Sequence, residues 1–304
     1  TSFMTMAYIL AVNPNILAAA GMDHGAVFTA TAVASFIGTL CMALFANYPF
    51  ALAPGMGLNA YFAYTVVLGM GYSWEVALAA VLTEGIIFII LSCFNIREAI
   101  FNAIPFNLKK AVSVGIGLFI TFLGLQNAKI VIGGATLVGL FSVDGYNKTL
   151  ADGLTASVSD AGITVLLAIF GVLITGILIV KNVKGNILWG ILITWILGII
   201  CQFAGIYIPN PDLGFYNLLP DFSNGISIPS LAPIMFKFSL KGVPVLEFIV
   251  IVFAFLFVDL FDTLGTLIGV SAKADMLDSE GRLPRIKGAL LADAVGTTCG
   301  ACLG

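Results

Sequence analysis

Two acidic residues stand in an otherwise apolar stretch, Phe257-Val258-Asp259-Leu260-Phe261-Asp262-Thr263-Leu264-Gly265-Thr266. On a helix, spacings of three and four residues place the acids and the threonines of this stretch on one face: Asp259, Asp262, Thr263 and Thr266. A charged side chain at the centre of a bilayer costs about 2.5–3.5 kcal/mol on insertion scales, so it needs a role there. The stripe predicts a substrate or proton site, and the alternative is a structural stripe packed against polar groups of neighbouring helices.

The residues around these acids limit the kinds of ligand that the acids can bind. No Lys or Arg falls in the middle of an apolar stretch, so we expect the carboxylates to have no intramembrane cation as a partner. Such a carboxylate binds a proton or accepts N–H groups from a ligand. A proton-coupled, N–H-rich substrate satisfies both conditions, and a strongly anionic substrate does not. Glu84 and Asp293 also lie in apolar stretches, where we interpret them as buried acids, with Glu84 a further candidate for proton coupling.

A second unusual stretch is Asn47-Tyr48-Pro49-Phe50-Ala51-Leu52-Ala53-Pro54-Gly55-Met56-Gly57-Leu58-Asn59-Ala60. Its prolines and glycines are poor helix formers, and irregular backbone at membrane depth is tolerated only where it lines a cavity or is buried in protein. The stretch predicts a broken helix. Its unpaired backbone groups at Gly55, Met56 and Gly57, together with the Asn59 amide, could hydrogen-bond a flat polar ligand. A kink that serves packing alone is the alternative.

The composition identifies the elements that must position these residues. Hydrophobic residues make up 60% of the 304 residues and charged residues 10%, against about 45–50% and about 25% in soluble domains. The excess must face lipid, so we predict an all-α polytopic membrane protein. The 13 Lys and Arg residues are too few and too scattered for a nucleic-acid groove. Runs long enough to cross a bilayer lie at about 4–20, 27–46, 50–70, 75–95, 111–128, 161–180, 186–206, 245–269 and 287–304.

The loops between these nine predicted spans set the orientation. With the N-terminus in the cytoplasm, nine basic residues lie on the cytoplasmic side and four on the other, as the positive-inside rule requires. The polar stretches 129–160 and 207–244 are outer loops, and residues 96–110 suit a short interfacial helix on the cytoplasmic face. The first and last spans are incomplete, so we interpret the sequence as a fragment of a longer transporter-like chain.

An internal repeat links the second predicted span to the last. Residues 38–45 and 296–303 share the pattern G-T-x-C-x-A-x-apolar. Because the copies lie in the second and the ninth predicted spans, seven spans from the start of one to the start of the other, they lie in opposite orientations, which is the inverted repeat of secondary transporters. The last span also carries a small residue at every fourth position, which predicts a close-packing face: Gly288, Ala292, Gly296, Gly300 and Gly304.

Four stretches resemble one known family: TMAYILAVNP at 5–14, APGMGLNAYFAY at 53–64, FVDLFDTLGTLIG at 257–269 and GALLADAVGTTCGACLG at 288–304. They are similar to the purine-permease branch of the xanthine/uracil permease family, and the resemblance runs along the whole chain. It implies an inverted-repeat fold of seven plus seven spans with a core and a gate domain. Residues 1–95 and 245–304 would then belong to the core, and residues 96–244 to the gate.

The resemblance also implies a site. Asp262 matches the acid that binds the nucleobase, Asn59 falls in the segment that borders the substrate, and Thr266 falls where some members carry a histidine. The family's other key acid lies in a tenth span, beyond this chain. The implied function is import of purine nucleobases (hypoxanthine, guanine, adenine) through the plasma membrane by proton symport, without a cofactor, metal or enzymatic activity. Candidates for proton coupling are Asp262, Asp259 and Glu84, and a homodimer is one assembly that the sequence allows.

Three other classes of membrane protein fit these residues less well than a purine permease does. An anion transporter of the related sulfate-permease type should lack an acid at the position of Asp262. A membrane prenyltransferase could use Asp259-x-x-Asp262 to hold magnesium diphosphate, but it needs a second Asp-rich cluster that the sequence does not show. An intramembrane aspartyl protease needs a Gly-x-Gly-Asp run, and the third span has Asn59 two residues after Gly57 instead.

Overall fold

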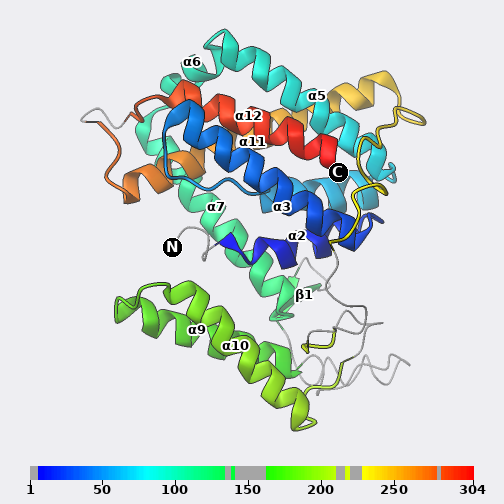
Figure 1. Cartoon of the computed structure of the whole chain (residues 1–304), viewed down its shortest axis with the longest axis vertical. Helices are drawn as coiled ribbons and strands as arrows, with labels where there is room; N and C mark the ends of the chain where they lie inside the picture. Colours follow the sequence, from blue (N-terminus) through cyan, green and yellow to red (C-terminus); the bar gives the residue numbers. More distant parts are fainter. Residues whose placement is uncertain (1–5, 134–137, 141–161, 210–215, 220–227, 279–281) are drawn as a thin grey trace. The chain divides into compact units, whose positions relative to one another are not determined.

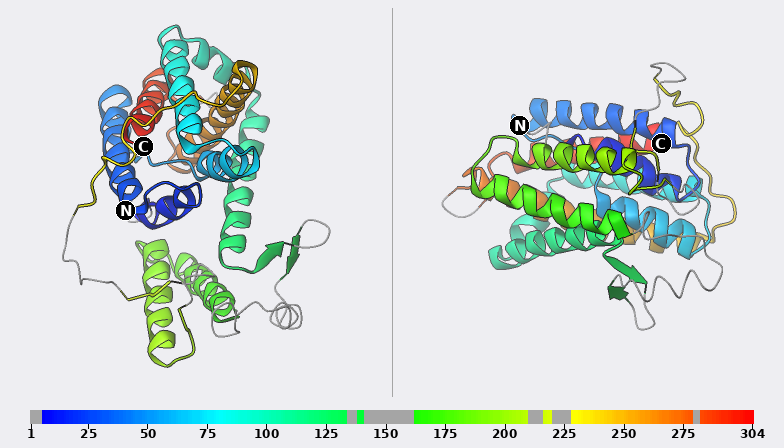
Figure 2. Two further views of the ribbon diagram at one scale, coloured as in Figure 1. Left: turned by 90° about the vertical axis from the view of Figure 1, so that its right-hand side faces the viewer. Right: turned by 90° about the horizontal axis from the view of Figure 1, so that it is seen from below.

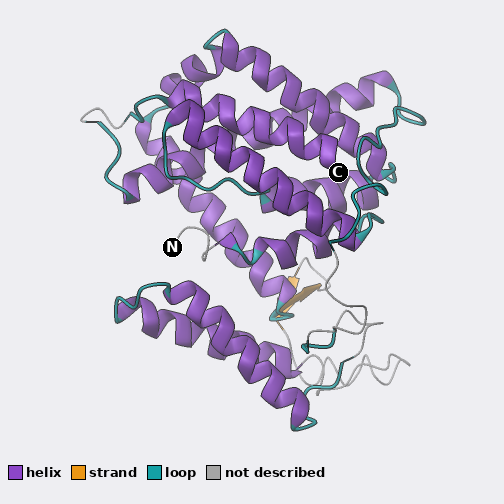
Figure 3. Cartoon of the chain, viewed as in Figure 1, coloured by secondary structure: helices purple, strands orange, loops and turns teal. Residues whose placement is uncertain are grey.

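The computed structural model describes residues 6–133, 138–140, 162–209, 216–219, 228–278 and 282–304, and these are predominantly helical (Figures 1 and 3). The helices are α2 (Ile9–Ala18), α3 (His24–Cys41), η1 (Met42–Ala46), α4 (Met56–Ala60), η2 (Tyr61–Gly69), α5 (Trp74–Cys93), α6 (Ile96–Ala103), α7 (Phe106–Asn127), α9 (Ile163–Val180), α10 (Asn186–Phe203), α11 (Val245–Lys273) and α12 (Ile286–Leu303). The segments η1 and η2 are π-helical continuations of α3 and α4. Strands β1 (Val131–Gly133) and β2 (Val138–Leu140) pair antiparallel.

Five of the described helical segments are long and apolar enough to cross a membrane: His24–Ala46, Trp74–Cys93, Ile163–Val180, Asn186–Phe203 and Ile286–Leu303. This agrees with the expected polytopic helical membrane protein. The count of nine spans and the seven-plus-seven repeat stay predictions. The predicted interfacial segment 96–110 is helical only to Ala103 as α6, and α7 begins at Phe106 just after Pro105, because proline disfavours a helical residue before it.

The chain divides into two compact units. One is formed by Met6–Phe119 and Ile228–Gly304, and the other by the described part of Ile120–Ser227. The smaller unit contains the antiparallel pair α9 and α10, which Figure 2 shows side by side. In this pair Thr194 fills the space beside Gly171 and Thr175 fills the space beside Gly190, so the two helices approach closely through small residues. Apolar side chains on their outer faces are exposed, as lipid-facing helices require.

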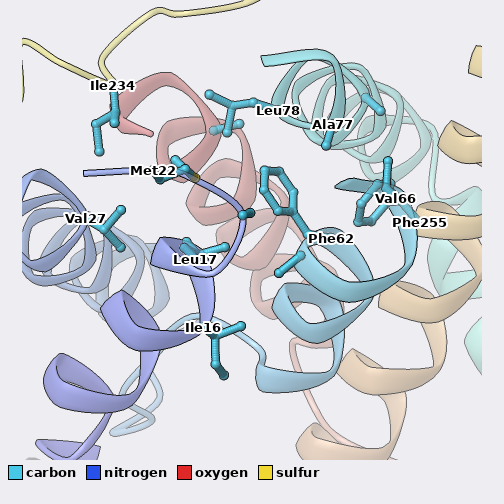
Figure 4. Close-up of a cluster of buried hydrophobic side chains, with 14 of the residues drawn as sticks. Ile16, Leu17, Met22, Val27, Phe62, Val66, Ala77, Leu78, Ile234 and Phe255 are labelled. Carbon is cyan, nitrogen blue, oxygen red and sulfur yellow. The ribbon is translucent and has the colours of Figure 1, made fainter. Parts of the chain in front are cut away.

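The larger unit is built around α12, which contacts α3 on one side and α5 on the other (Figure 1). A buried cluster joins α2, α3, η2, α5 and α11, and Figure 4 shows its members Leu17, Val27, Phe62 and Phe255 pointing toward one another. A second cluster joins η1 to α11 and α12 through residues such as Met42, Leu264 and Leu290. These two clusters fix α11, the helix of the acidic stripe, against the rest of the unit.

The stretch predicted to be a broken helix is non-helical over residues 47–55, and α4 begins only at Met56. Asn47 ends η1 in the left-handed conformation, with φ 55°. The Thr39 hydroxyl on α3 then holds the stretch in place, accepting a hydrogen bond from the Leu52 N–H at 3.0 Å. The predicted irregular backbone at this position is confirmed.

The small-residue face of α12 packs where the sequence predicts close contact. Gly296 lies against Gly38 of α3, so that a Cβ on Gly296 would be 3.5 Å from the Gly38 Cα. Gly288 lies directly against the backbone of Phe45, and Gly300 lies against Ala34. The two copies of the G-T-x-C pattern therefore meet at their glycines.

Substituting Gly288 with alanine is expected to destabilise the protein. The new Cβ would lie 2.8 Å from the Phe45 carbonyl carbon, and backbone cannot move aside as a flexible side chain can. Overpacking of this kind costs about 1–3 kcal/mol. The measurement is the Tm of the purified full-length protein in detergent. Gly300→Ala is the matched control on the same helix, because its Cβ would lie 3.8 Å from the Ala34 Cβ, an ordinary contact; equal Tm values for the two variants would contradict the close packing at Gly288.

Candidate functional site

The residues of the acidic stripe on α11 contact two different parts of the structure. Asp259 and Thr263 are buried, at 3% and 6% exposure, and they face α12 and α6. Asp262 is half-buried and faces the stretch before α4. Thr266 is exposed, and its hydroxyl donates to the Asp262 carbonyl of its own helix at 2.8 Å. The four residues share one helical face, as their spacing predicts, but different elements pack against it: α6 and α12 meet Asp259 and Thr263, and the stretch before α4 meets Asp262.

Asp262 and the start of α4 lie side by side. A Cβ on Gly55 would be 2.8 Å from Oδ2 of Asp262, so this carboxylate occupies the space that a side chain at position 55 would need. Gly55 is the N-cap of α4, and the first N–H groups of a helix have no carbonyl of that helix to bind. The half-buried Met56 and Gly57 supply such groups. An acceptor carboxylate and unpaired backbone donors thus lie close together.

Asn59 lies one turn further along and is held by side chains that the sequence did not single out. Its Nδ2 donates to Oδ1 of Asn13 on α2, and Asn13 in turn donates to the Thr31 hydroxyl at 2.8 Å. Within the described residues, Oδ1 of Asn59 has no hydrogen-bond partner. The Asn13 contact therefore fixes the amide and leaves it an acceptor. A signal for Asn13 was present, since it lies in the TMAYILAVNP stretch.

The expectation that no cation reaches the carboxylates is wrong. Arg97, at the start of α6, has a fully buried side chain that extends among α5, α11 and α12. Its Nη2 lies 2.7 Å from Oδ2 of Asp293 and 3.7 Å from Oδ2 of Asp259. Sequence position alone assigned Arg97 to a cytoplasmic loop, but an arginine side chain is long enough to reach the interior from a helix end.

Further contacts fix the Arg97 guanidinium on several sides. Nη1 donates to the Leu290 carbonyl of α12 at 2.9 Å, and Nη2 donates to the Thr263 hydroxyl at 3.3 Å. The Thr263 hydroxyl lies 2.9 Å from Oδ2 of Asp293, to which it donates. The guanidinium also lies over the Phe88 ring of α5, 3.9 Å from its centroid, in a cation–π contact. One cation thus joins α5, α6, α11 and α12.

Glu84 is the third acid near this cation. It lies one turn before Phe88 on α5, its side chain is fully buried, and it interacts electrostatically with Asp259, Asp293 and Arg97. Neither of its carboxyl oxygens has a hydrogen-bond partner of good geometry among the described residues. We call Glu84, Arg97, Asp259, Thr263 and Asp293 the Arg97 cluster.

Comparison of the sequence with known proteins identifies the family to which the chain belongs. The model of the xanthine/uracil permease family, described as a permease family, matches residues 1–304. The chain belongs to the xanthine/uracil permease family. This permease chain is 48% identical over its whole length to a protein of Methanocaldococcus jannaschii that is named only as a permease, covering 63% of that protein.

Two relatives of the permease chain carry more specific names. It is 43% identical to the guanine/hypoxanthine permease PbuG of Bacillus subtilis, matching 100% of this chain and 64% of PbuG. It is 36% identical to the adenine permease AdeP of Escherichia coli, matching 100% of this chain and 61% of AdeP. The permease chain therefore spans less than two thirds of the length of these relatives.

The Arg97 cluster yields a stability prediction for the permease. Arg97→Met leaves Asp259 and Asp293 without their cation, and removing one partner of a buried ion pair costs about 3–5 kcal/mol. We expect a lower Tm and less protein in the membrane. Adding Asp293→Asn should recover part of the loss, because it removes one of the unpaired charges.

Arg282→Met is the matched control, because Arg282 is exposed, and surface ion pairs contribute only about 0–1 kcal/mol. A Tm for Arg97→Met that equals that of Arg282→Met would show that the buried contacts of Arg97 do not stabilise the protein.

Proposed function

We propose that this protein is a secondary active transporter that imports purine nucleobases, namely hypoxanthine, guanine or adenine, by proton symport. The observation that carries the proposal is Asp262, a half-buried carboxylate without a side-chain hydrogen-bond partner in the described part of the chain. It lies beside Gly55 and the first N–H groups of α4. The named substrates of PbuG and AdeP support purines as the ligand class.

The chemistry of a purine suits this arrangement. A purine ring presents N–H donors on one part of its edge and nitrogen or carbonyl acceptors on another. We infer that Asp262 accepts ring N–H groups, since hydrogen bonds to an ionised acceptor are about twice as strong as neutral ones. The backbone at Gly55, Met56 and Gly57 and the amide of Asn59 bind the remaining edge. Thr266 borders the site with its hydroxyl bound to its own helix.

The transport cycle that we propose is alternating access between a core and a gate domain, with residues 1–95 and 245–304 in the core and 96–244 in the gate. The larger compact unit joins α2–α5 to α11 and α12, but it also contains α6, with Arg97, and α7 up to Phe119, so the body that we propose to move with the core extends past residue 95. The contact between Gly38 and Gly296 supports an inverted repeat, because it brings equivalent positions of the two copies together. A cytoplasmic N-terminus, insertion in the plasma membrane and a homodimer belong to the same proposal.

The alternatives fit the geometry less well. In a prenyltransferase, Asp259 and Asp262 would hold one magnesium diphosphate together, but Asp259 lies 3.7 Å from Arg97 whereas Asp262 lies beside Gly55. An anion carrier of the sulfate-permease type would expose a cation to its ligand, and the Arg97 guanidinium is fully buried against acids. Neither alternative is favoured by the family or by the named relatives.

Asp262→Asn tests the proposed ligand contact. The amide removes a charged acceptor, and a hydrogen bond to a charged group contributes about 1.5–3 kcal/mol, which corresponds to a loss of affinity of about 10- to 100-fold. We expect uptake of radiolabelled hypoxanthine, guanine and adenine to fall by this factor in cells without their own nucleobase carriers, at unchanged membrane abundance. Asp275→Asn is the matched control, because Asp275 is exposed just after α11. Normal purine uptake by Asp262→Asn would refute the site.

Gly55→Ala tests the close approach of Asp262 to α4. The new Cβ would lie 2.8 Å from Oδ2 of Asp262, so the carboxylate must rotate away while the fold accommodates the change. A displacement that breaks one charged hydrogen bond should raise the KM for purines about tenfold or more, with little change in Tm. Gly300→Ala is the control, since its Cβ would lie 3.8 Å from the Ala34 Cβ, an ordinary contact outside the proposed ligand site. A KM that is the same in both variants would contradict the proposed position of the ligand.

A further inference from the structure

The Arg97 cluster has more acids than one cation can balance. Arg97 carries one positive charge, and Glu84, Asp259 and Asp293 would together carry three negative charges if all were ionised. Asp262 lies near enough for Asp293 and Asp259 to act on it electrostatically. An uncompensated charge in a buried site costs several kcal/mol, so at least one of these carboxyl groups holds a proton as long as the cluster is closed to water.

The contacts distinguish the three acids. Asp293 has a 2.7 Å ion pair with Arg97 and accepts from the Thr263 hydroxyl, so it is stabilised as a carboxylate. Asp259 lies 3.7 Å from the same guanidinium and 3.3 Å from the Thr263 hydroxyl. Glu84 has no ion pair within 4.0 Å and no hydrogen bond of good geometry among the described residues; the group it interacts with is another acid, Asp259, and its side chain is fully buried. Glu84 is therefore the acid whose ionised form is least compensated.

Two other acids, Asp293 and Asp259, lie near Glu84 as candidate relay groups for a proton. The Asp293 side chain is 21% exposed, so water can reach the cluster there while Glu84 stays enclosed. In the other direction, Asp259 interacts with both Glu84 and Asp262. Because Asp259 and Asp262 lie on the same turn of α11, a change of charge at Glu84 is felt at the proposed ligand site through Asp259.

We propose that Glu84 is the coupling-proton site of the transporter, with Arg97 as the residue that keeps Asp259 and Asp293 ionised, and that Asp262 contacts the purine without carrying the coupling proton. This inference rests on the proposed proton symport and assigns its proton among Asp262, Asp259 and Glu84. The charged groups that act on Glu84 in the described part of the chain are Arg97 from α6, Asp259 from α11 and Asp293 from α12.

The proposed coupling has the sign that symport requires. A proton on Glu84 removes one negative charge from the cluster, which lets Asp262 stay ionised beside Asp259 and accept purine N–H groups. By reciprocity, a bound purine favours the protonated form of Glu84 to the same extent. Loss of the proton through the exposed side of Asp293 leaves excess negative charge near Asp262, and the purine is released.

Glu84→Gln tests the assignment in the full-length protein, because glutamine mimics the protonated acid and cannot release a proton. We expect hypoxanthine exchange across preloaded vesicles to remain within about threefold of wild type, whereas accumulation driven by a pH gradient falls about 5-fold or more. The dependence of uptake on pH should flatten. Glu75→Gln is the matched control, the same change on the same helix outside the Arg97 cluster, and it should retain both exchange and accumulation.

The outcomes distinguish the proposal of proton symport from the assignment of its proton to Glu84. Wild-type purine uptake that a protonophore leaves unchanged would refute proton symport and with it the assignment to Glu84. Wild-type uptake that collapses with the protonophore, together with a Glu84→Gln variant that accumulates purine in the same protonophore-sensitive way, would refute only the assignment. Where Glu84→Gln does not reach the membrane, Glu84→Asp decides: moving the carboxyl group by one methylene must shift the pH dependence of uptake, and an unshifted profile overturns the inference.

Discussion

The buried Arg97 guanidinium is the interaction on which the larger unit depends. It approaches Asp293 to 2.7 Å, Asp259 to 3.7 Å and the Phe88 ring to 3.9 Å, so α5, α6, α11 and α12 share one cation. Acids at membrane depth are tolerated when they are paired. Arginine suits this position because its planar fork donates to Asp293, Thr263 and the Leu290 carbonyl together. The acids of α11 and α12 can therefore persist in an apolar bundle.

The contacts of Arg97 also divide the acids of α11 between a structural role and the proposed ligand site. Asp259 and Thr263 contact Arg97, whereas Asp262 lies beside Gly55, where we propose that the ligand binds. Gly55 completes this arrangement, because any side chain there would occupy the space of the Asp262 carboxylate. A backbone cap with donor groups and an acceptor carboxylate thus lie side by side, which supports the proposed ligand with both donors and acceptors.

Local patterns in the sequence predicted part of the fold and of the candidate site. Contacts between residues far apart in sequence could not be predicted from such patterns. The prolines and glycines of 47–57 predicted the irregular backbone, and the period of four in α12 predicted its packing face, because both effects act within a few residues. The Arg97 contact joins residues 196 apart in sequence, and the Asn59 contact with Asn13 joins residues 46 apart. Periodicity carries no information on such pairs, and counting charges by loop assigned Arg97 to the cytoplasmic face of the membrane.

In the proposed alternating access, the location of these groups in one compact unit would keep the distances within the site constant. Asp262, Gly55 and all members of the Arg97 cluster belong to the unit formed by Met6–Phe119 and Ile228–Gly304. Their mutual distances are set by helix contacts within that unit, so a rigid-body motion of the unit need not alter them. What can change during such a motion is access of water to the partly exposed Asp293, and therefore the charge of the cluster. In the cycle that we propose, the geometry of recognition therefore stays constant, and protonation of the cluster alters the affinity for the ligand.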